Sequence, residues 1–509
     1  MNTILEQIET AARSHPESAA IVRGGESLTY SQLWRIVDSV SVAALEWGAK
    51  PGDRFIFGAR PTPNSIAYAL GLLRAGLTLV FVDPFSAQEL FNSRVEMVKP
   101  RLVVADSLLY AIGSRGFAWL RRVRRINVCN YGQLGGVQHL YLGRRLPGVP
   151  LRAQALAAWA RSGRPASAPA LAQPNPQADA IVTFTSGTTG EPKGVVHTLA
   201  SISANVVNFA NRFGIAPGSL VYAEPMTLGV VALTRGATWR IPVDSEALPQ
   251  VIDVLFAVPA DLSKILLKEG RVSQRPVVRV VGTGAAPVLP PLIEDIAATF
   301  GASTEIVNVY GMTEMLPIAT CDARAKLAHI ADGGRGDLVG LPMGDTKIRL
   351  ATDGEIQVSG SGLMNRYFGR QPQEWHPTGD LGTIRADGQL VLLGRKKNML
   401  IRGNMNIYPS LYEPGICTIS GVADAAIVGV PDRIGDDRVM LFVVAKKGSD
   451  PAKVLAAVRA QVHLHMDEDA LPDRVELLEA MPLSGRSLKR DPLVLTQLAR
   501  ARFEAGGSR

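Results

Sequence analysis

The chain reads Ile181-Val182-Thr183-Phe184-Thr185-Ser186-Gly187-Thr188-Thr189-Gly190-Glu191-Pro192-Lys193-Gly194-Val195-Val196 at the point that decides its fold. An apolar, β-branched strand pattern runs here into three glycines, four hydroxyl side chains and one lysine within ten residues. Such a loop can turn backbone N–H groups toward an anion, add hydroxyl donors and bring one ammonium group to a polyphosphate. We therefore predict that this segment, the phosphate loop (Thr185–Lys193), binds ATP; the alternative is a glycine-rich hairpin between two strands. It is not a GxxxxGK[ST] loop, because the lysine follows a proline and precedes a glycine. The expected nucleotide contacts are Thr185, Ser186, Gly187, Thr188, Thr189 and Gly190, with Lys193 as a candidate catalytic residue.

The sequence before the loop alternates between helical and strand periods. A helical pattern follows Thr29, residues 53–57 form a short strand pattern, and a second helix is expected from about Asn64. Residues 151–179 are rich in Ala, Pro, Ser and Arg with little periodicity, which predicts a connector over the surface. This part of the chain is therefore α/β in character.

The sequence after the loop predicts a β-rich region and a compact tail. Short strands at 355–359 and 390–393 indicate an antiparallel region late in a large domain. Strands at 425–430 and 439–445 and a helix at 451–462 indicate a small α+β domain at the C-terminus. The predicted fold class is α/β, with a large N-terminal domain of α/β subdomains that includes a β-rich region, plus a small C-terminal domain.

Length and composition exclude several classes of protein. The 509 residues exceed the roughly 250–300 that one hydrophobic core usually supports. With 47% hydrophobic and 20% charged residues, the chain is typical of a folded globular protein and not of a disordered or fibrous one. The net charge of +8 is mild for this length, and the arginine cluster at 121–125 is best interpreted as solvated surface, since no recognisable nucleic-acid module accompanies it. No nucleic-acid partner is expected.

Three features of the sequence indicate where in the cell the protein is located: its cysteines, its N-terminus and its longest apolar stretch. The cysteines form neither a disulfide framework nor a CxxC pair. The first ten residues lack the basic and apolar regions of a signal peptide. The longest apolar stretch, 66–82, contains Arg74 and is shorter than the roughly 20 apolar residues that cross a bilayer. We expect a soluble cytoplasmic protein without a membrane span.

The segment from Thr185 to Gly194 resembles the signature of the adenylate-forming superfamily, which includes acyl-CoA synthetases, luciferases and the adenylation domains of peptide synthetases. Four further segments resemble this superfamily in the expected order, so the resemblance covers nearly the whole chain. It implies ATP and Mg²⁺ as cofactors and a carboxylic acid as substrate.

Two of these segments imply contacts with the base and the α-phosphate. Gly282-Thr283-Gly284-Ala285-Ala286-Pro287 resembles the loop that lies along adenine, where small residues let the backbone approach a flat base closely. Asn308-Val309-Tyr310-Gly311-Met312-Thr313-Glu314 resembles the motif whose tyrosine stacks on adenine, whose threonine meets the α-phosphate and whose glutamate helps to hold Mg²⁺. The nucleotide contacts that the resemblance implies are Gly284, Ala285, Ala286, Pro287, Asn308, Val309, Tyr310, Gly311 and Met312, with Thr313 and Glu314 as catalytic candidates and Glu314 as the metal ligand.

The other two segments imply a ribose site and a hinge. Thr378-Gly379-Asp380-Leu381 resembles the segment whose aspartate accepts hydrogen bonds from the ribose hydroxyls, although out of context it also fits a β-turn. Gly394-Arg395-Lys396-Lys397-Asn398 resembles the domain boundary, where Arg395 also reaches the ribose. The implied domains are 1–395 and 396–509, with a hinge near Lys397 and a mobile C-terminal domain.

The resemblance implies a two-step reaction. A carboxylate attacks the α-phosphorus of ATP to give an acyl-adenylate and pyrophosphate, and the acyl group then passes to an acceptor. The stretch 401–409 looks most like the acyl-CoA ligase version of the loop after the hinge. Coenzyme A is therefore the first candidate acceptor, with a carrier protein or another nucleophile as alternatives.

The C-terminal tail departs from the family pattern. Relatives usually show Ser-Gly-Lys where this chain reads Ser484-Gly485-Arg486, and that lysine bridges the carboxylate and the α-phosphate. A planar guanidinium does not replace a compact ammonium conservatively at a tight phosphoryl site. Lys489 could substitute if the loop is shifted, or it could be an exposed tail lysine. Arg486 and Lys489 are both catalytic candidates, and a catalytically impaired nucleotide-binding relative is an alternative function.

A second departure lies in the region that usually walls the acyl pocket. Residues 225–236 are shorter than usual and lack an aromatic-His pair, which indicates a specialised acid or acceptor. The residues after Glu314 also resemble the β-lactone synthetases of olefin biosynthesis, in which an activated β-hydroxy acid is attacked by its own hydroxyl. The candidate acyl-pocket residues, which also fit an ordinary core, are Met226, Val258, Met315 and Leu316.

One histidine follows the phosphate loop closely. His197 could act as a general base, but a structural or nucleotide-neighbouring role is the preferred interpretation.

Overall fold

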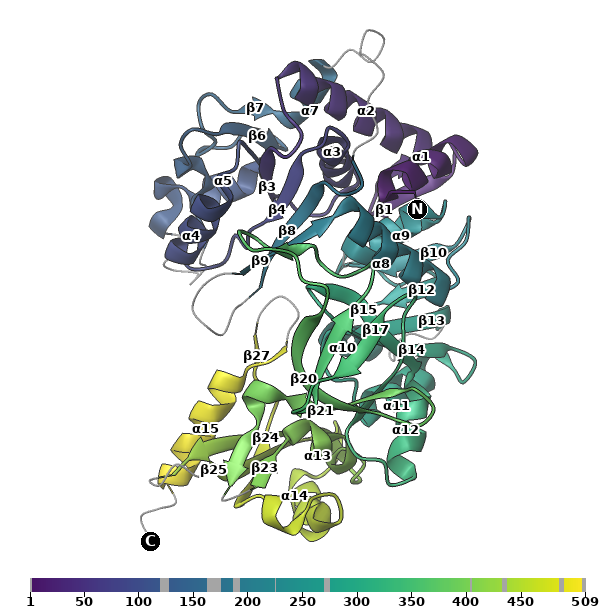
Figure 1. The fold of residues 1–509 in the computed structure, drawn as a ribbon, viewed down its shortest axis with the longest axis vertical. Helices are drawn as coiled ribbons and strands as arrows, with labels where there is room; N and C mark the ends of the chain where they lie inside the picture. Colours follow the sequence, from purple (N-terminus) through teal and green to yellow (C-terminus); the bar gives the residue numbers. More distant parts are fainter. Residues whose placement is uncertain are drawn as a thin grey trace. The chain divides into compact units, whose positions relative to one another are not determined.

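The structure is a computed structural model that describes residues 2–119, 128–162, 175–185, 193–224, 226–269, 275–402, 405–432, 437–484 and 489–505 (Figure 1). The chain forms two compact units, each assembled from separate segments. The first unit contains Met1–Glu246, Thr313–Leu316 and Ser361–Glu374. The second unit contains Ala247–Met312, Pro317–Gly360 and Trp375–Arg509. The arginine cluster at 121–125 lies outside the described residues.

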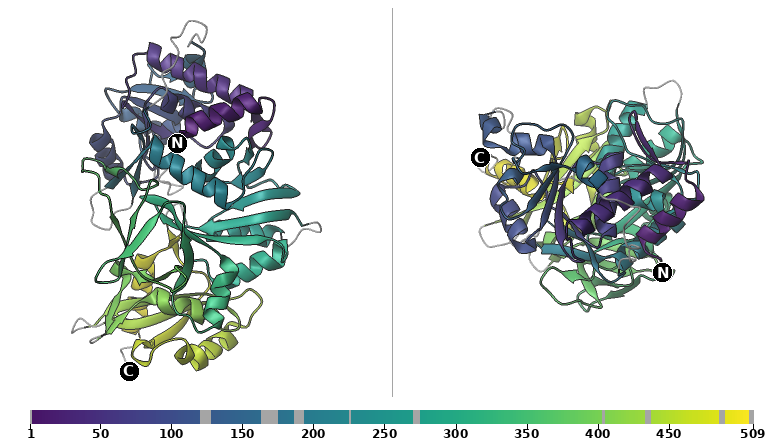
Figure 2. Two further views of the ribbon diagram at one scale, coloured as in Figure 1. Left: turned by 45° about the vertical axis from the view of Figure 1, so that its right-hand side comes forward. Right: turned by 90° about the horizontal axis from the view of Figure 1, so that it is seen from above.

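The first unit is built on a mostly parallel sheet. The phosphate-loop strands lie near one edge of it, because β8 pairs in parallel with β4 and antiparallel with β9. In spatial order its strands are β19 (Arg366–Tyr367), β9 (Lys193–Thr198), β8 (Asp179–Thr185), β4 (Thr78–Phe81), β3 (Arg54–Gly58), β5 (Leu102–Asp106), β6 (Gln138–Leu142) and β7 (Gln154–Ala155). The edge strand β19 comes from the returning segment Ser361–Glu374, which is drawn in green beside β8 and β9 (Figures 1 and 2).

Helices α2 (Tyr30–Glu46) and α3 (Pro63–Arg74) of this unit begin where the sequence predicts them. Thr29 caps α2 in a capping box with Gln32, and Thr62 caps α3 in the same way with Ser65. The two helices pack on one another so closely that a Cβ atom at Gly71 would lie 2.6 Å from Val40. The predicted strand at 53–57 is confirmed as β3. The other helices of the unit are α1 (Ile4–Ser14), α4 (Gln88–Val98), α5 (Ser107–Gly113), α7 (Leu156–Ser162), α8 (Leu199–Arg212) and α9 (Met226–Thr234).

The connector predicted at 151–179 is wrong for its first part. Strand β7 and helix α7 lie in this stretch, and residues 163–174 lie outside the described residues. Leu156 is fully buried and Trp159 is 7% exposed, and α7 packs against α2. An alanine-rich helix of two turns is too short to show a clear period, so tertiary packing decides its structure.

Among the described residues, the first unit contains four further strands. Strands β10 (Leu220–Ala223), β11 (Thr238–Arg240) and β1 (Ala19–Arg23) are parallel neighbours, and β2 (Glu26–Thr29) runs antiparallel to β1. Trp239 on β11 is fully buried, and its indole packs so closely on α9 that a Cβ atom at Gly229 would lie 2.0 Å from it.

The second unit contains parallel strands, an antiparallel region and the C-terminal part. The parallel strands are β12 (Val251–Phe256), β13 (Val277–Gly284) and β14 (Glu305–Met312). The antiparallel region contains β15 (Met315–Asp322, of this unit from Pro317), β16 (Asp337–Pro342), β21 (Leu390–Arg395), β20 (His376–Ile384), β18 (Glu355–Ser359) and β17 (Lys347–Leu350) in spatial order. The helices are α10 (Pro259–Glu269), α11 (Pro290–Phe300) and α12 (Ala323–Ala331). The predicted β-rich region is confirmed, since β18 and β21 cover its two expected strands.

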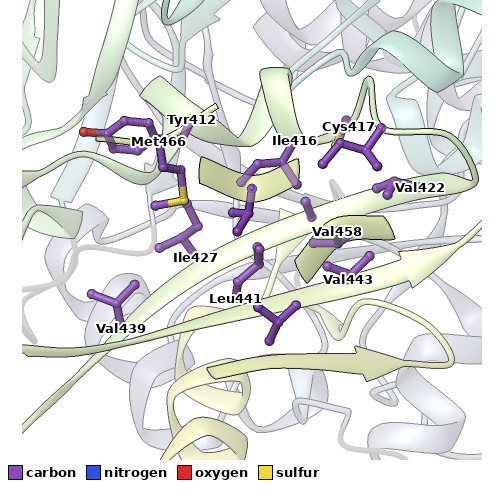
Figure 3. Close-up of a cluster of buried hydrophobic side chains, with 14 of the residues drawn as sticks. Tyr412, Ile416, Cys417, Val422, Ile427, Val439, Leu441, Val443, Val458 and Met466 are labelled. Atoms are coloured by element: carbon purple, nitrogen blue, oxygen red, sulfur yellow. The ribbon is translucent and has the colours of Figure 1, made fainter. Parts of the chain in front are cut away.

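The C-terminal part of the second unit has its own core. Strands β24 (Val422–Pro431) and β25 (Asp437–Ala445) are antiparallel, and β26 (Arg474–Leu478) runs parallel to β25. Buried side chains of α13 (Pro409–Ile416) and α14 (Pro451–Gln461) pack on this sheet, as the close-up of the cluster around Ile416, Leu441 and Val458 shows (Figure 3). The other strands and α-helix of this part are β22 (Leu400–Arg402), β23 (Met405–Ile407), β27 (Leu483–Ser484), β28 (Lys489–Arg490) and α15 (Pro492–Ala505).

The predicted fold class is confirmed: the chain is mixed α/β, with a large N-terminal part and a small C-terminal part. The domain boundary at 395/396 and the mobility of the C-terminal domain stay predictions. Within the described ranges, no helix combines the length and the apolar character that crossing a membrane requires.

Candidate active site

The phosphate loop joins β8 to β9. Thr185 ends β8 and Lys193 begins β9, and the antiparallel register places the two residues opposite one another. The predicted contacts Ser186, Gly187, Thr188, Thr189 and Gly190 lie outside the described residues. The hairpin therefore presents the two ends of the loop, one hydroxyl and one ammonium group, side by side.

Glu314 lies close to this hairpin within the first unit. Thr313 and Glu314 form a two-residue turn between β14 and β15; Thr313 is exposed, whereas Glu314 is 8% exposed. The hydroxyl of Tyr367 donates a hydrogen bond to Oε1 of Glu314 at 2.7 Å, and Nζ of Lys193 lies 5.5 Å from the centre of the Tyr367 ring. Tyr367 thus links the two predicted catalytic groups. The sequence alone does not identify Tyr367, because no local pattern connects it with a turn 53 residues away.

His197 supports the backbone next to Glu314. Its Nε2 lies 2.8 Å from the carbonyl oxygen of Thr313, and its Nδ1 lies 3.1 Å from Oγ of Ser201. Since a carbonyl oxygen only accepts, Nε2 carries the proton. Burial lowers the pKa of His197, although Thr313 and Glu314 oppose this effect, so the ring stays neutral near pH 7. Both ring nitrogens are occupied, which fits the structural role rather than that of a general base.

The candidate adenine loop of the second unit contains a close backbone approach. Gly284 ends β13, and a Cβ atom at this position would lie 2.2 Å from the carbonyl oxygen of Val309 on β14, so only glycine fits. Ala285 has a φ of +67°, a strained value for a residue with a side chain. The hydroxyl of Thr283 is fully buried and has no hydrogen-bond partner in the part of the chain that the structure describes. Strain and an unpaired buried hydroxyl are typical of a functional loop.

The predicted ribose contacts, Asp380 and Arg395, come together in the same unit with Tyr310, the predicted adenine contact. The hydroxyl of Tyr310 donates to Oδ2 of Asp380 at 2.7 Å, and Nε of Arg395 donates to Oδ1 at 2.9 Å. Asp380 is 7% exposed, and its backbone N–H donates to Oγ1 of Thr378. Burial, followed by the charge of Asp380, raises the pKa of Tyr310, which keeps its hydroxyl a donor. The result is a fixed carboxylate with unused lone pairs, which suits it to accept further hydrogen bonds from a diol.

The remaining residues of the adenine motif belong to β14. Asn308 and Val309 are buried, whereas Gly311 and Met312 are half-buried at the end of the strand. In the adenine loop, Ala286 is half-buried and Pro287 is exposed.

Lys489 lies within electrostatic reach of the candidate ribose-binding carboxylate of Asp380, whereas Arg486 lies outside the described residues. Strand β28 pairs with β27, which places Lys489 opposite Ser484. Much of Lys489 is exposed, but desolvation of its ammonium group and the charge of Arg395 lower its pKa, and Asp380 opposes them. Lys489 therefore lies within electrostatic reach of Asp380 and Arg395.

The candidate acyl-pocket residues do not form one described group. Met315 is fully buried and Leu316 half-buried in the first unit, whereas Val258 belongs to the second unit. Met226 begins α9, and its side chain lies outside the described residues. The acyl pocket stays a prediction.

A magnesium ion fits the environment of Glu314. The side-chain hydrogen bond to Tyr367 uses Oε1, and Oε2 makes no hydrogen bond to any residue that the structure describes. Mg²⁺ is usually held by one or two carboxylates together with substrate phosphates rather than by an all-protein cage. The described ranges contain no cluster of three or more His, Cys, Asp or Glu side chains that could hold a metal.

Comparison with known proteins is consistent with this arrangement. Residues 8–368 match the AMP-binding enzyme family, and residues 412–487 match the AMP-binding enzyme C-terminal domain. A methyl-dioxo-octahydroindenyl propanoyl:CoA ligase of Rhodococcus jostii (strain RHA1) is 28% identical over 476 residues, which cover 87% of this chain and 88% of that protein. An olefin beta-lactone synthetase of Stenotrophomonas maltophilia (strain K279a) is 26% identical, and the match covers 92% of this chain and 92% of that protein.

A solved structure shows the same fold. The amide bond synthetase McbA from Marinactinospora thermotolerans superposes with a TM-score of 0.78 at 23% identity, over 97% of this chain and 99% of that one. The chain therefore belongs to the AMP-binding enzyme family, the adenylate-forming superfamily that its motifs predict, and is an AMP-forming acid ligase.

Proposed function

We propose that the protein activates a carboxylic acid with ATP and transfers the acyl group to coenzyme A. The observation that carries the proposal is the cluster of Lys193, Tyr367 and Glu314, in which an ammonium group at the end of the phosphate loop and a buried carboxylate share one tyrosine. An ammonium group suits an anionic polyphosphate, and the carboxylate suits the metal ion that accompanies it.

In the first step, a carboxylate oxygen of the acid bonds to the α-phosphorus of ATP. The bond from that phosphorus to the oxygen bridging to the β-phosphorus breaks, and pyrophosphate leaves. Lys193 and the phosphate loop would bind the phosphates, while Tyr310, Asp380 and Arg395 would bind the nucleoside. Mg²⁺ bound through Glu314 would supply neutralisation of phosphate charge. No protein nucleophile is needed, since catalysis of this kind consists mainly of positioning and charge stabilisation.

In the second step, the thiolate of coenzyme A bonds to the acyl carbon, and AMP leaves. The Rhodococcus relative, which is a CoA ligase, supports this acceptor. A cytoplasmic location also fits, because Cys129, Cys321 and Cys417 are buried free thiols, a form that a reducing compartment maintains.

A second candidate function is closure of a β-lactone. The Stenotrophomonas relative matches 92% of this chain, and its name states this activity. In that reaction the β-hydroxyl of the activated acid bonds to its own acyl carbon as AMP leaves. Transfer to a carrier protein would use the same first step with a different thiol.

One experiment separates these functions. Purified protein is incubated with ATP, Mg²⁺ and a panel of acids, pyrophosphate release is followed with and without coenzyme A, and products are identified by mass. A thioester formed only with coenzyme A is the expected result. A product lighter than its acid by one water, formed without coenzyme A, would establish the lactone instead. No pyrophosphate with any acid would favour a nucleotide-binding relative without this activity.

Replacing Lys193 with alanine should weaken the use of ATP. The substitution removes a charge-assisted contact to phosphate, and we expect the KM for ATP to rise roughly 10-fold. Pyrophosphate exchange at varied ATP concentrations measures this change. The matched control is Lys264→Ala, which removes an exposed lysine that pairs with Asp261. A KM within twofold of the wild type for Lys193→Ala would contradict the assignment.

Replacing Arg486 with lysine tests the departure in the tail. If the arginine is an impaired replacement, a compact ammonium group should raise the rate of pyrophosphate exchange, by roughly 10-fold for one restored charge-assisted contact. A fall in the rate would show that the arginine is adapted to this site. Lys489→Ala is the companion variant, because Lys489 already lies near Asp380 and Arg395. A large loss in Lys489→Ala would assign the role to Lys489.

A further inference from the structure

The segment Ser361–Glu374 is fastened to the strand that begins at Lys193. In β19, Tyr367 is the register partner of Val195 and Arg366 that of Val196. The backbone N–H of Phe368 donates to the carbonyl oxygen of Gly194 at 2.7 Å. This pairing fixes the position of Tyr367 relative to the end of the phosphate loop.

An ion pair secures the same segment to the first strand of the hairpin. Arg366 donates to both carboxylate oxygens of Asp179 on β8, at 2.8 Å and 2.6 Å. Such a two-point contact is geometrically specific, because the planar guanidinium matches the planar carboxylate. Tyr367 is therefore presented from a strand that is held to both β8 and β9.

The turn that carries Glu314 is held to the same segment. The backbone N–H of Met364 donates to the carbonyl oxygen of Glu314 at 2.7 Å. Three residues further along the chain, the hydroxyl of Tyr367 donates to Oε1 of the Glu314 side chain. Backbone and side chain of Glu314 are thus bound by one short stretch of chain. A glutamate side chain that is free to rotate loses conformational entropy when it binds a metal, and a glutamate already fixed by hydrogen bonds loses less.

The hydroxyl and the ring of Tyr367 make different contacts. The hydroxyl of Tyr367 donates a hydrogen bond to Oε1 of the Glu314 carboxylate at 2.7 Å. Its ring lies within the range of a cation–π interaction with the ammonium group of Lys193. One side chain therefore contacts the candidate metal ligand through oxygen and the candidate phosphate ligand through its ring.

We propose that Tyr367 is a positioning residue that orients the carboxylate of Glu314 for Mg²⁺ and holds Lys193 beside it, so that Mg²⁺ and the phosphates of ATP bind cooperatively. The inference rests on the proposed function, since it assigns Mg²⁺ and ATP to these two side chains. Tyr367 has two roles in this proposal. Its hydroxyl orients the carboxylate that binds Mg²⁺, and its ring holds the ammonium group of Lys193.

The test is calorimetric titration of the full-length protein with ATP, with and without Mg²⁺. In the wild type, Mg²⁺ should tighten ATP binding. In Tyr367→Phe, which keeps the ring and removes the hydroxyl, we expect this Mg²⁺-dependent gain to fall roughly 10-fold, while the affinity for ATP without Mg²⁺ changes less than twofold. In Tyr367→Leu, which also removes the ring, the affinity without Mg²⁺ should fall as well, by about threefold.

Tyr412→Phe is the matched control. The hydroxyl of Tyr412 donates to Oδ2 of Asp467 at 2.9 Å, so this variant also removes a tyrosine–carboxylate hydrogen bond, at a position without a proposed role in ATP binding. We expect wild-type values for both titrations. A double variant, Tyr367→Phe with Glu314→Gln, distinguishes an effect of Tyr367 through Glu314 from a general effect on the structure. If Tyr367 acts through Glu314, loss of the hydroxyl in the Glu314→Gln protein should change the Mg²⁺ dependence less than twofold.

Three results would overturn the inference. The first is a Tyr367→Phe protein whose Mg²⁺-dependent gain stays within twofold of the wild type. The second is an equal loss in Tyr412→Phe, which would mean that general destabilisation explains the effect. The third is a wild-type protein that binds ATP equally with and without Mg²⁺. A wild-type protein that binds no ATP would instead overturn the proposed function itself, and the titration distinguishes this case because it requires no acid substrate.

Discussion

Replacing Glu314 with glutamine is expected to lower kcat/KM for ATP–pyrophosphate exchange by roughly 10²–10³-fold. Glutamine is nearly isosteric and can still accept the hydrogen bond from Tyr367, so the fold around the turn should survive. The substitution removes the negative charge that suits Mg²⁺, and a neutral amide is a weaker ligand for a hard cation. Exchange measured over a range of Mg²⁺ concentrations should show both the lower rate and a weaker response to Mg²⁺.

The control for this variant is Glu294→Gln. Glu294 lies on α11, where its side chain is 56% exposed and pairs with Lys446. This change also removes one negative charge from a glutamate, and we expect less than a twofold effect on exchange. A Glu314→Gln enzyme within threefold of the wild type would show that this carboxylate does not hold the metal.

Replacing Arg490 with methionine is expected to destabilise the C-terminal part of the second unit by about 3 kcal/mol. Arg490 on β28 donates to Oε2 of Glu413 on α13 at 2.7 Å and also binds Asp424 on β24. Its side chain is 18% exposed and that of Glu413 is 9% exposed, so removal of the guanidinium leaves two carboxylates without their cation. Uncompensated charge of this kind is costly where water cannot replace the partner.

Hydrogen exchange of the full-length protein measures this effect locally. Amide protection in β24 and β25 should fall roughly 100-fold, whereas the eight-stranded sheet of the first unit should keep its protection. Arg335→Met is the control, because Arg335 pairs with Asp467 where both side chains are about half exposed. Exposed pairs contribute about 0–1 kcal/mol, so protection should change little. Equal losses in the two variants would mean that the contacts of Arg490 contribute no more than a surface ion pair.

The elements that the sequence predicted well share a local cause. Helix α2 begins directly after Thr29 because this threonine and a glutamine three residues later form a capping box. Strand β3 is a short, mostly apolar run. Both signals lie within a few residues. The wrong element is the connector at 151–179, where α7 forms because Leu156 and Trp159 pack against a helix more than a hundred residues earlier.

Some features of the candidate site were likewise indicated by the sequence, whereas others required the tertiary structure. The resemblance implied Asp380 and Arg395 as ribose contacts and Tyr310 as an adenine contact, whereas the structure shows that Tyr310 and Arg395 both donate hydrogen bonds to Asp380. The need for glycine at 284 is a steric demand from Val309, which sequence could indicate only as a preference for small residues. The acyl pocket was predicted from apolar residues alone, and apolar residues are equally typical of a core, so this prediction had the weakest basis.

The sequence by itself determined the family, the nucleotide chemistry and the order of the elements, because those signals are contiguous: a run of glycines, hydroxyls and a lysine is recognisable without its surroundings. Only the tertiary structure decided that Tyr367 joins Lys193 to Glu314 and that Arg490 joins Glu413 to Asp424. These contacts form between residues separated by tens to hundreds of positions. They depend on how strands and helices pack, and packing leaves no trace in the local pattern of a single sequence.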